Sequence, residues 1–323
     1  MKRIEDLLKD AGIEGGLSLK GCPVNLREKN RVNLLALGDV GTTVLIGLRL
    51  LGSDVISEIG ICDIHEPNMV RCEEEINQIN YPFGMAELPV VRMIREKDLF
   101  DCDVLIFCAS KGVPPIGAEG DVRMAQLAAN REIISRYGKL AKDSAFGGLV
   151  AVVSVPVDPL CRAFLSSAGL RPSQVQGYGL GVMNARALYF AEKDQRLYHY
   201  ASEGRAFGPH GEDLIIADSV TAYDDQLSRE LTDLTVSANM RVRELGFKPY
   251  IAPALSSAAI SILLTLRGEW HYSSLYLGNE EEGAFMGMKN RMGTEGPEYE
   301  DIPLCEELYG RIKNAYDNLC KIK

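Results

Sequence analysis

The sequence predicts an α/β protein built on a doubly wound parallel sheet. Four apolar runs without polar alternation have the composition of strands buried on both faces, at 32–37, 58–64, 103–109 and 149–155. Amphipathic stretches separate these runs, including 42–51 and 121–143. Alternation of strands and helices is typical of parallel strands that are joined by right-handed crossovers.

The second half of the chain follows another pattern, which predicts a smaller α+β domain after Gly181. Asp158 and Pro159 suit the N-cap and first position of a helix that reaches Ala168. Further expected elements are helices at 182–193, 219–245 and 252–267, ribbon-like segments at 196–207, and two β segments within 270–299. A final helix places five apolar residues on one stripe, Leu304, Leu308, Ile312, Ala315 and Leu319.

These patterns divide the chain into three parts. We expect an N-terminal arm at 1–30, in which Ile4, Leu7, Leu8 and Ala11 form an amphipathic segment, a dinucleotide-binding domain at 31–175 and a substrate domain at 176–323. The apolar helices near 160 and 255 are either intramolecular core or subunit interfaces.

The composition is that of a globular protein that buries a core without disulfides or metals. Hydrophobic residues make up 46% of the 323 residues and charged residues 25%. The formal charge of -10 argues against nucleic acid as a partner, because binding to a phosphate backbone needs clustered lysine and arginine. An acidic partner would instead be a small anion that a few local arginines hold.

Cysteine usage predicts a reduced, cytoplasmic protein. The sequence has eight cysteines and no Cys-x-x-Cys spacing, and Cys62 and Cys108 lie inside apolar runs as small core residues. The first 30 residues are charged and lack the apolar core of a signal peptide. The longest apolar stretches are too short to span a bilayer, so we expect no membrane contact. Because the cysteines lack the spacing of metal ligands, we also expect no metal site.

The segment Ala36–Gly41, A-L-G-D-V-G, follows a buried strand and opens a helix, as the phosphate-binding turn of a Rossmann domain does. Gly38 allows the backbone to approach a pyrophosphate, Gly41 allows close packing of helix and strand, and the helix N-terminus offers free N–H groups. Asp63 ends the second strand, where a carboxylate accepts a hydrogen bond from a ribose hydroxyl. This acid favours NAD over NADP.

Asp39 opposes the dinucleotide interpretation, because a carboxylate facing a pyrophosphate is repelled unless it turns to solvent. The alternative is an ordinary tight turn between strand and helix. If the site holds NAD, the predicted contact residues are Gly38, Asp39, Val40, Gly41, Asp63 and Ala109.

After residue 31 the chain resembles the lactate/malate dehydrogenase family along nearly its whole length. Six landmarks occur in the family's order: LALGDVGTT with Asp63 downstream, DVRMAQLAANREII, VVSVPVDPL, GVMNARALYFAEK, FGPHGED and YIAPALSSAA. The resemblance implies an NAD-dependent oxidoreductase, a small 2-hydroxy or 2-oxo carboxylic acid as substrate, and a homo-oligomer that is a dimer or a tetramer.

The resemblance also implies roles for three side chains. His210 would exchange a proton with the substrate oxygen while hydride moves between the nicotinamide and the carbon. Arg186 would hold the substrate carboxylate, for which a bidentate guanidinium is suited, and Arg123 would polarise the reacting carbonyl from a mobile loop. The alternatives are a loop or core histidine and two arginines on solvated helix surfaces.

Two departures from the family pattern weaken this assignment. Met183 stands where the family has the aspartate that orients the histidine, and Val155 stands where it has an asparagine near the reacting oxygen. Each loss is expected to remove about 2–4 kcal/mol of transition-state stabilisation, by analogy with deletion of an oxyanion donor. Glu212 or Asp213 would have to replace the missing acid, and Lys111 is either an anion contact or a solvated loop lysine.

Three functions remain open from the sequence. The first is an NAD-dependent oxidoreductase acting on a 2-hydroxy or 2-oxo acid, supported by His210, Arg123 and Arg186. The second is a nucleotide-binding or regulatory relative that has lost the reaction, supported by Met183 and Val155. A third is another reaction at the same cofactor site, such as a hydride-assisted elimination.

Overall fold

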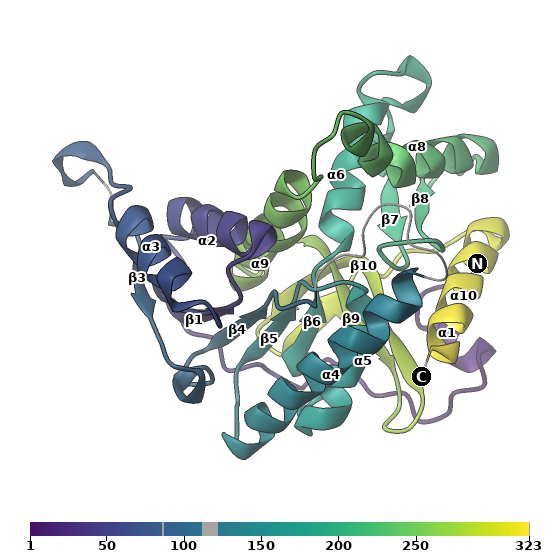
Figure 1. The fold of residues 1–323 in the computed structure, drawn as a ribbon. Coiled ribbons are helices and arrows are strands. Elements are labelled where there is room, and N and C mark those ends of the chain that lie inside the picture. The colour runs from purple at the N-terminus through teal and green to yellow at the C-terminus, as the bar shows by residue number, and fades with distance from the viewer. Residues whose placement is uncertain (86, 112–121, 323) are drawn as a thin grey trace.

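The computed structural model describes residues 1–85, 87–111 and 122–322, and for residues 122–125 it describes the backbone alone. Within these ranges one large sheet of nine strands forms the centre of the molecule, with helices on both of its faces (Figure 1). Its strands are β1 (Asn30–Leu35), β2 (Ile56–Cys62), β3 (Val90–Met93), β4 (Val104–Phe107), β5 (Leu149–Val152), β6 (Val175–Gly177), β9 (His271–Gly278), β10 (Gly283–Gly293) and β11 (Gly296–Tyr299). A separate ribbon pairs β7 (Arg205–Phe207) with β8 (Ile215–Ala217).

The helices connect these strands and cover the sheet. They are α1 (Asp6–Asp10), α2 (Asp39–Leu51), α3 (Glu66–Asn77), α4 (Val122–Asp143), α5 (Val157–Ala168), α6 (Leu180–Ala191), α7 (Tyr200–Glu203), α8 (Asp225–Glu244), α9 (Ser261–Leu266) and α10 (Glu306–Lys321). A π-helical segment, η5 (Pro253–Ile260), leads directly into α9.

The parallel part of the sheet has the strand order β6-β5-β4-β1-β2-β3, so the predicted doubly wound fold is confirmed. The chain reverses its direction of winding between β1 and β4, and ligands bind such sheets at the carboxyl ends of these strands. Leu35 and Phe107 pair at that edge. The four predicted strands are all present, with boundaries displaced by up to three residues.

Three elements after β5 differ from the prediction. The segment 270–299 forms three strands, and β9 pairs antiparallel with β6 through Gly177 and Ser274, so this half extends the main sheet. The expected ribbon over 196–207 was wrong for its first part, which forms short helical turns up to Glu203. Helix α5 begins at Val157 with Pro156 as its N-cap, so Asp158 is a buried residue inside the helix.

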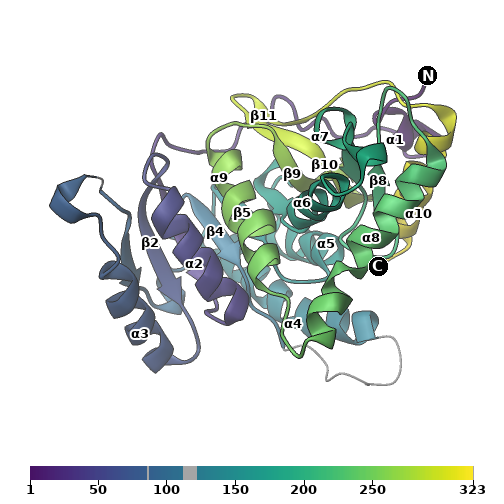
Figure 2. The same ribbon diagram turned by 90° about the horizontal axis from the view of Figure 1, so that it is seen from above.

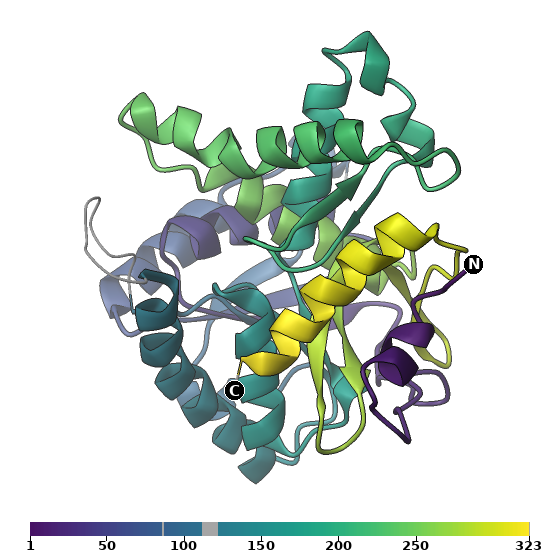
Figure 3. The same cartoon turned by 90° about the vertical axis from the view of Figure 1, so that its right-hand side faces the viewer.

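The N-terminal arm packs on the last helix. Ile4 and Leu7 are buried in one cluster with Leu308 and Ile312, and Lys2 pairs with Leu304 in an isolated β-bridge. Figure 3 shows α1 beside α10 on this side of the molecule. All five residues of the predicted stripe belong to this cluster and are confirmed as core, but Leu304 precedes α10, so only four of them lie on the helix.

The segment η5 lies between α2 and α6 and connects the two halves. A Cβ built on Gly47 of α2 would lie 2.7 Å from the Cβ of Ala259, and one built on Gly181 of α6 would lie 2.5 Å from the carbonyl oxygen of Ser256. Figure 2 shows α2, the helix formed by η5 and α9, and α6 in this lateral order. A π-helix is rare and occurs often at functional sites.

The cysteines are free, and Cys62 is buried in the core as expected, whereas Cys108 is only partly buried and packs against the core. Across the described ranges, no group of three or more histidine, cysteine or acidic side chains is arranged to hold a metal ion. In the same ranges, no helix combines the length and the apolar character that crossing a bilayer requires.

We expect His271 to limit stability in acid. Burial lowers the pKa of its imidazole to about 4, while Nδ1 bonds to Glu269 O at 3.0 Å and Nε2 lies 2.9 Å from Thr265 Oγ1. As pH falls from about 6.5 to about 4, His271 becomes protonated in the unfolded chain but stays neutral in the folded chain. The free energy of unfolding should therefore drop by about 3 kcal/mol. Urea denaturation across this range should show a smaller drop for His271→Gln, whereas the exposed-site control His65→Gln should keep the wild-type slope. Equal slopes for both variants would contradict the assignment.

Candidate active site

The turn between β1 and α2 has the close packing of a phosphate-binding loop. A Cβ on Gly41 would lie 2.0 Å from the carbonyl oxygen of Ala36 and 3.6 Å from the Cβ of Cys108, so only glycine fits there. Gly38 is the N-cap of α2 and no side chain caps its first N–H groups. Ala36 has φ +75°, a conformation that favours glycine, so its methyl group is held in a strained turn.

Asp63 supports this loop from the end of β2. Its Oδ2 accepts the Leu37 backbone N–H at 2.6 Å and its Oδ1 accepts the His65 N–H at 2.8 Å. Each carboxylate oxygen has a second lone pair, and Asp63 is partly exposed. The residue therefore shapes the loop and can still accept a hydrogen bond from a ligand hydroxyl.

Asp39 occupies the first position of α2, at the end where an anion would bind. Its Oδ2 forms an ion pair at 3.0 Å with Nζ of Lys248, from the segment that follows α8, and both side chains are largely exposed. The carboxylate is thus exposed, and a cation from the second half of the chain lies beside it. Val40 packs on the core beside this loop.

His210 is held by a backbone carbonyl at the start of α6. Its Nδ1 lies 2.9 Å from Gly179 O, and since a carbonyl can only accept, Nδ1 carries the proton. The same carbonyl accepts the hydroxyl of Ser257 at 2.7 Å. Met183, which stands where the resemblance implies an aspartate, is buried on α6. The orientation of the imidazole is thus set by Gly179, which lies at the N-cap of the helix that carries Met183.

A buried carboxyl group lies under the loop that carries His210. Burial raises the pKa of Asp158 to about 7, an effect that the Ser274 hydroxyl and the His210 backbone N–H partly offset. Its Oδ1 is buried and has no hydrogen-bond partner among the described residues. Asp158 was predicted as a helix cap, and its place beside His210 is a finding of the structure.

Arg186 points its guanidinium at neutral groups. One NH group donates to Sδ of Met183 at 3.6 Å and another to Oδ1 of Asn239 on α8. Burial lowers the pKa of Arg186, and no carboxylate of the described residues contributes to that shift or pairs with it. A largely buried cation without a counter-ion is costly unless an anion binds there, so this position is suited to a substrate carboxylate.

The edge of the sheet beside β5 holds the other predicted residues. Val155 is 37% exposed, and its carbonyl accepts Nδ2 of Asn130 at 2.9 Å. Ala109 follows β4, and its carbonyl accepts the Ser154 hydroxyl at 2.7 Å. Lys111 forms an exposed ion pair with Glu132 at 3.2 Å, in agreement with a solvated lysine.

The structure bears differently on Arg123 and on Glu212 and Asp213, the two candidates for a replacement acid. The backbone of Arg123 lies in the first turn of α4, but its side chain is outside the described residues, as are Pro114 and Pro115 of the substrate loop. Asp213 accepts Nδ2 of Asn318 on α10 at 3.1 Å, so this carboxylate is engaged away from α6. Glu212 as a replacement acid stays a prediction.

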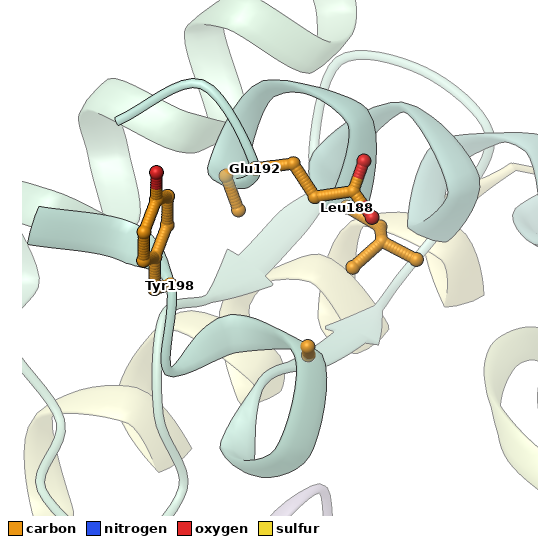
Figure 4. A pocket seen from close by; sticks show the side chains of 5 residues that line it. Leu188, Glu192 and Tyr198 are labelled. Carbon is orange, nitrogen blue, oxygen red and sulfur yellow. The ribbon is translucent and has the colours of Figure 1, made fainter. Parts of the chain in front are cut away.

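A separate hollow of about 300 Å³ lies between α6 and α7. Its walls are mostly apolar, and Leu188, Glu192 and Tyr198 line it (Figure 4). None of the predicted site residues belongs to this lining, and its only charged group is a carboxylate. The hollow is therefore unsuited to an anionic substrate and is distinct from the candidate site.

The fold and the loop define a protein with a Rossmann-type dinucleotide-binding domain and a second, α+β half. The family model for the lactate/malate dehydrogenase NAD binding domain matches residues 30–177. The cofactor half of the chain is thus similar to the corresponding domain of the lactate/malate dehydrogenase family.

Similar proteins carry the same family names. L-lactate dehydrogenase of Mesomycoplasma hyopneumoniae is 27% identical over 192 residues, which cover 58% of each chain, and that of Treponema denticola is 28% identical over 200 residues. The matched segment thus spans about three fifths of these relatives. Among solved structures, a lactate dehydrogenase from a deep-sea metagenome library has a TM-score of 0.76 at 19% identity, over 92% of this chain and 98% of that one. Malate dehydrogenase from Picrophilus torridus has a TM-score of 0.74 at 19% identity, over 91% of this chain and 96% of that one, and both likenesses concern the fold.

Proposed function

We propose that this protein is an NAD-dependent oxidoreductase that transfers hydride between the nicotinamide and a 2-hydroxy or 2-oxo carboxylic acid. One observation carries the proposal. Arg186, a largely buried guanidinium without an acidic partner in the described ion pairs, lies on the helix whose N-cap carbonyl holds His210. The proposed anion-binding group is therefore a side chain of α6, and the proposed proton-exchanging group is hydrogen-bonded to the N-cap carbonyl of the same helix.

The residues of this chain would act in a simple sequence. Arg186 binds the substrate carboxylate through two parallel N–H bonds. His210, which carries its proton on Nδ1, accepts the hydroxyl proton at Nε2 when a 2-hydroxy acid is oxidised and returns it in the reverse direction. Arg123 remains the proposed group for polarising the carbonyl. NAD, when bound, supplies the acceptor or donor of the hydride.

The residues of the first half fit NAD, with one exception. Gly38 leaves the N–H groups of α2 without a side-chain cap, Gly41 permits the tight turn, and Asp63 retains acceptor capacity for a ribose. Asp39 is the exception, because it places a negative charge beside the proposed pyrophosphate site. Val40 and Ala109 are proposed as further contacts from α2 and from the end of β4.

We expect removal of the Asp39 charge to strengthen cofactor binding. In Asp39→Asn the positive N-terminus of α2 and Lys248 no longer interact with a carboxylate and can attract the pyrophosphate instead. The affinity for NADH should therefore rise about three- to tenfold. Titration of NADH followed by calorimetry measures the change, with Asp317→Asn, a surface pair on α10, as the control. Unchanged or weaker binding would show that Asp39 does not face the phosphates.

The experiment that tests the function is a steady-state assay with NADH and a panel of 2-oxo acids, repeated with NAD and the matching 2-hydroxy acids. We expect at least one acid to turn over above the blank. Rates equal to the blank for every acid, in both directions, would exclude the proposal.

A second function is favoured by particular residues. Met183, Val155 and Asp39 all depart from what the reaction or the cofactor requires, which supports a nucleotide-binding or regulatory relative with impaired catalysis. Tight NADH binding without turnover would favour this alternative. Turnover of any 2-oxo acid would exclude it.

We further propose the division into an arm at 1–30, a cofactor domain at 31–175 and a substrate domain at 176–323. Residues on and after the second half of α8 leave apolar surface exposed, among them Met240, Leu245 and Phe247. We propose that the protein is a cytoplasmic homo-oligomer, dimer or tetramer, without nucleic acid or membrane as partner. Sedimentation equilibrium would decide between these assemblies and a monomer.

A further inference from the structure

Helix α6 and the segment η5 touch backbone to backbone beside His210. A Cβ on Gly181 would lie 2.5 Å from Ser256 O and 3.0 Å from the Cα of Ser257, so this approach requires glycine. A Cβ on Gly179 would lie 3.0 Å from the Cβ of His210. The histidine therefore lies directly against the start of α6, and η5 contacts the same turn of the helix at Gly181.

The Ser257 hydroxyl makes two hydrogen bonds at this contact. It accepts the Val182 backbone N–H at 2.8 Å and donates to Gly179 O at 2.7 Å, and the residue is only 2% exposed. The N–H groups in the first turn of a helix have no intrahelical partner, so Ser257 caps α6 from a neighbouring element.

The carbonyl of Gly179 is consequently fixed by two donors, the Ser257 hydroxyl and Nδ1 of His210. Its direction determines which imidazole nitrogen carries the proton and how the ring is turned. Met183 has no group that can accept this proton strongly, and its sulfur faces Arg186. The backbone carbonyl of Gly179 therefore accepts the Nδ1 proton of His210 in place of a side-chain carboxylate.

We propose that Ser257 is a positioning residue, whose hydroxyl holds the His210 imidazole in its Nδ1–H tautomer through the carbonyl of Gly179. The catalytic part of this inference rests on the proposed function. The tautomer is a property of the protein alone and can be measured without substrate or cofactor.

The first test is ¹⁵N NMR of the imidazole rings at neutral pH. The chain has four histidines, and the His210 signals are assigned by their loss in His210→Asn. We expect the wild-type ring in the Nδ1–H form and a gain of the Nε2–H form in Ser257→Ala. Ser257→Thr, which keeps the hydroxyl, should retain the wild-type spectrum. Ser256→Ala is the matched control, because that hydroxyl makes no hydrogen bond within the described residues. A wild-type ring in the Nε2–H form would overturn the proposal without any variant.

The second test is kinetic. In Ser257→Ala, kcat should fall about 10- to 100-fold, since a small misplacement of a catalytic group has effects of this size, while the Kd for NADH stays within about twofold. Ser257→Thr and Ser256→Ala should keep the wild-type kcat. An unchanged tautomer together with an unchanged kcat in Ser257→Ala would overturn the proposal. If the wild type turns over no acid, the proposed function fails, whereas the NMR comparison still decides the role of Ser257.

Discussion

Replacing His210 with asparagine should lower kcat by about 10²- to 10⁴-fold, the usual contribution of a positioned general acid or base. Asparagine cannot take up a proton from a substrate hydroxyl near neutral pH, although its amide N–H can still donate to the carbonyl of Gly179. The loss should therefore be confined to the chemical step. Steady-state rates with the best acid of the panel provide the measurement.

Two further measurements and a control variant make this test specific. NADH affinity and the thermal midpoint should stay close to wild type in His210→Asn, because the imidazole is only partly buried and lies in the second half of the chain. His199→Asn is the control, since His199 pairs with Asp218 at 3.2 Å and not with the carbonyl of Gly179. Turnover of His210→Asn within about fivefold of wild type would remove His210 from the reaction.

Local sequence patterns were sufficient for four of the six parallel strands, β1, β2, β4 and β5. Each of these is an apolar run that is recognisable by itself, and the glycine turn before α2 is contiguous in sequence. The short strands β3 and β6 were not predicted, because VVRM and VQG are too short and too polar to stand out as apolar runs. The antiparallel extension was missed, because the pairing of Gly177 with Ser274 joins distant segments and leaves no local signature. The short helical turns around Gln195–Leu197 were missed for a related reason, since their type depends on tertiary packing.

Sequence patterns also predicted only part of the candidate site. His210 and Arg186 were proposed from short motifs, and Met183 was noted because it stands where the family pattern has an acid. Gly179 and Ser257 could not be assigned, although a glycine pair at a helix start and a serine pair in an apolar helix were visible signals. Their role depends on a contact between α6 and η5, which only the folded chain brings together.

Arg186→Leu should lower kcat/KM by about a thousandfold, mostly through KM, because the substrate carboxylate loses a charged, bidentate partner in a partly desolvated position. Arg186→Lys should recover only part of this loss, since an ammonium group cannot reproduce the two parallel bonds. The control is Arg229→Leu, which removes an exposed arginine of α8 that pairs with Asp225. Kinetics of Arg186→Leu within a few-fold of wild type would move the carboxylate site elsewhere.

Arg186→Leu should lower activity but should not lower the stability of the fold. In the wild type the guanidinium is held by Met183 and Asn239, which leave its charge without a counter-ion within the described residues. Because a buried unpaired charge costs free energy of folding, Arg186→Leu should be at least as stable as wild type. Oxamate, a carboxylate mimic, should raise the thermal midpoint of the wild type and leave that of Arg186→Leu unchanged. A structural arginine would give the reverse result, a destabilised variant and no response to the anion in either protein.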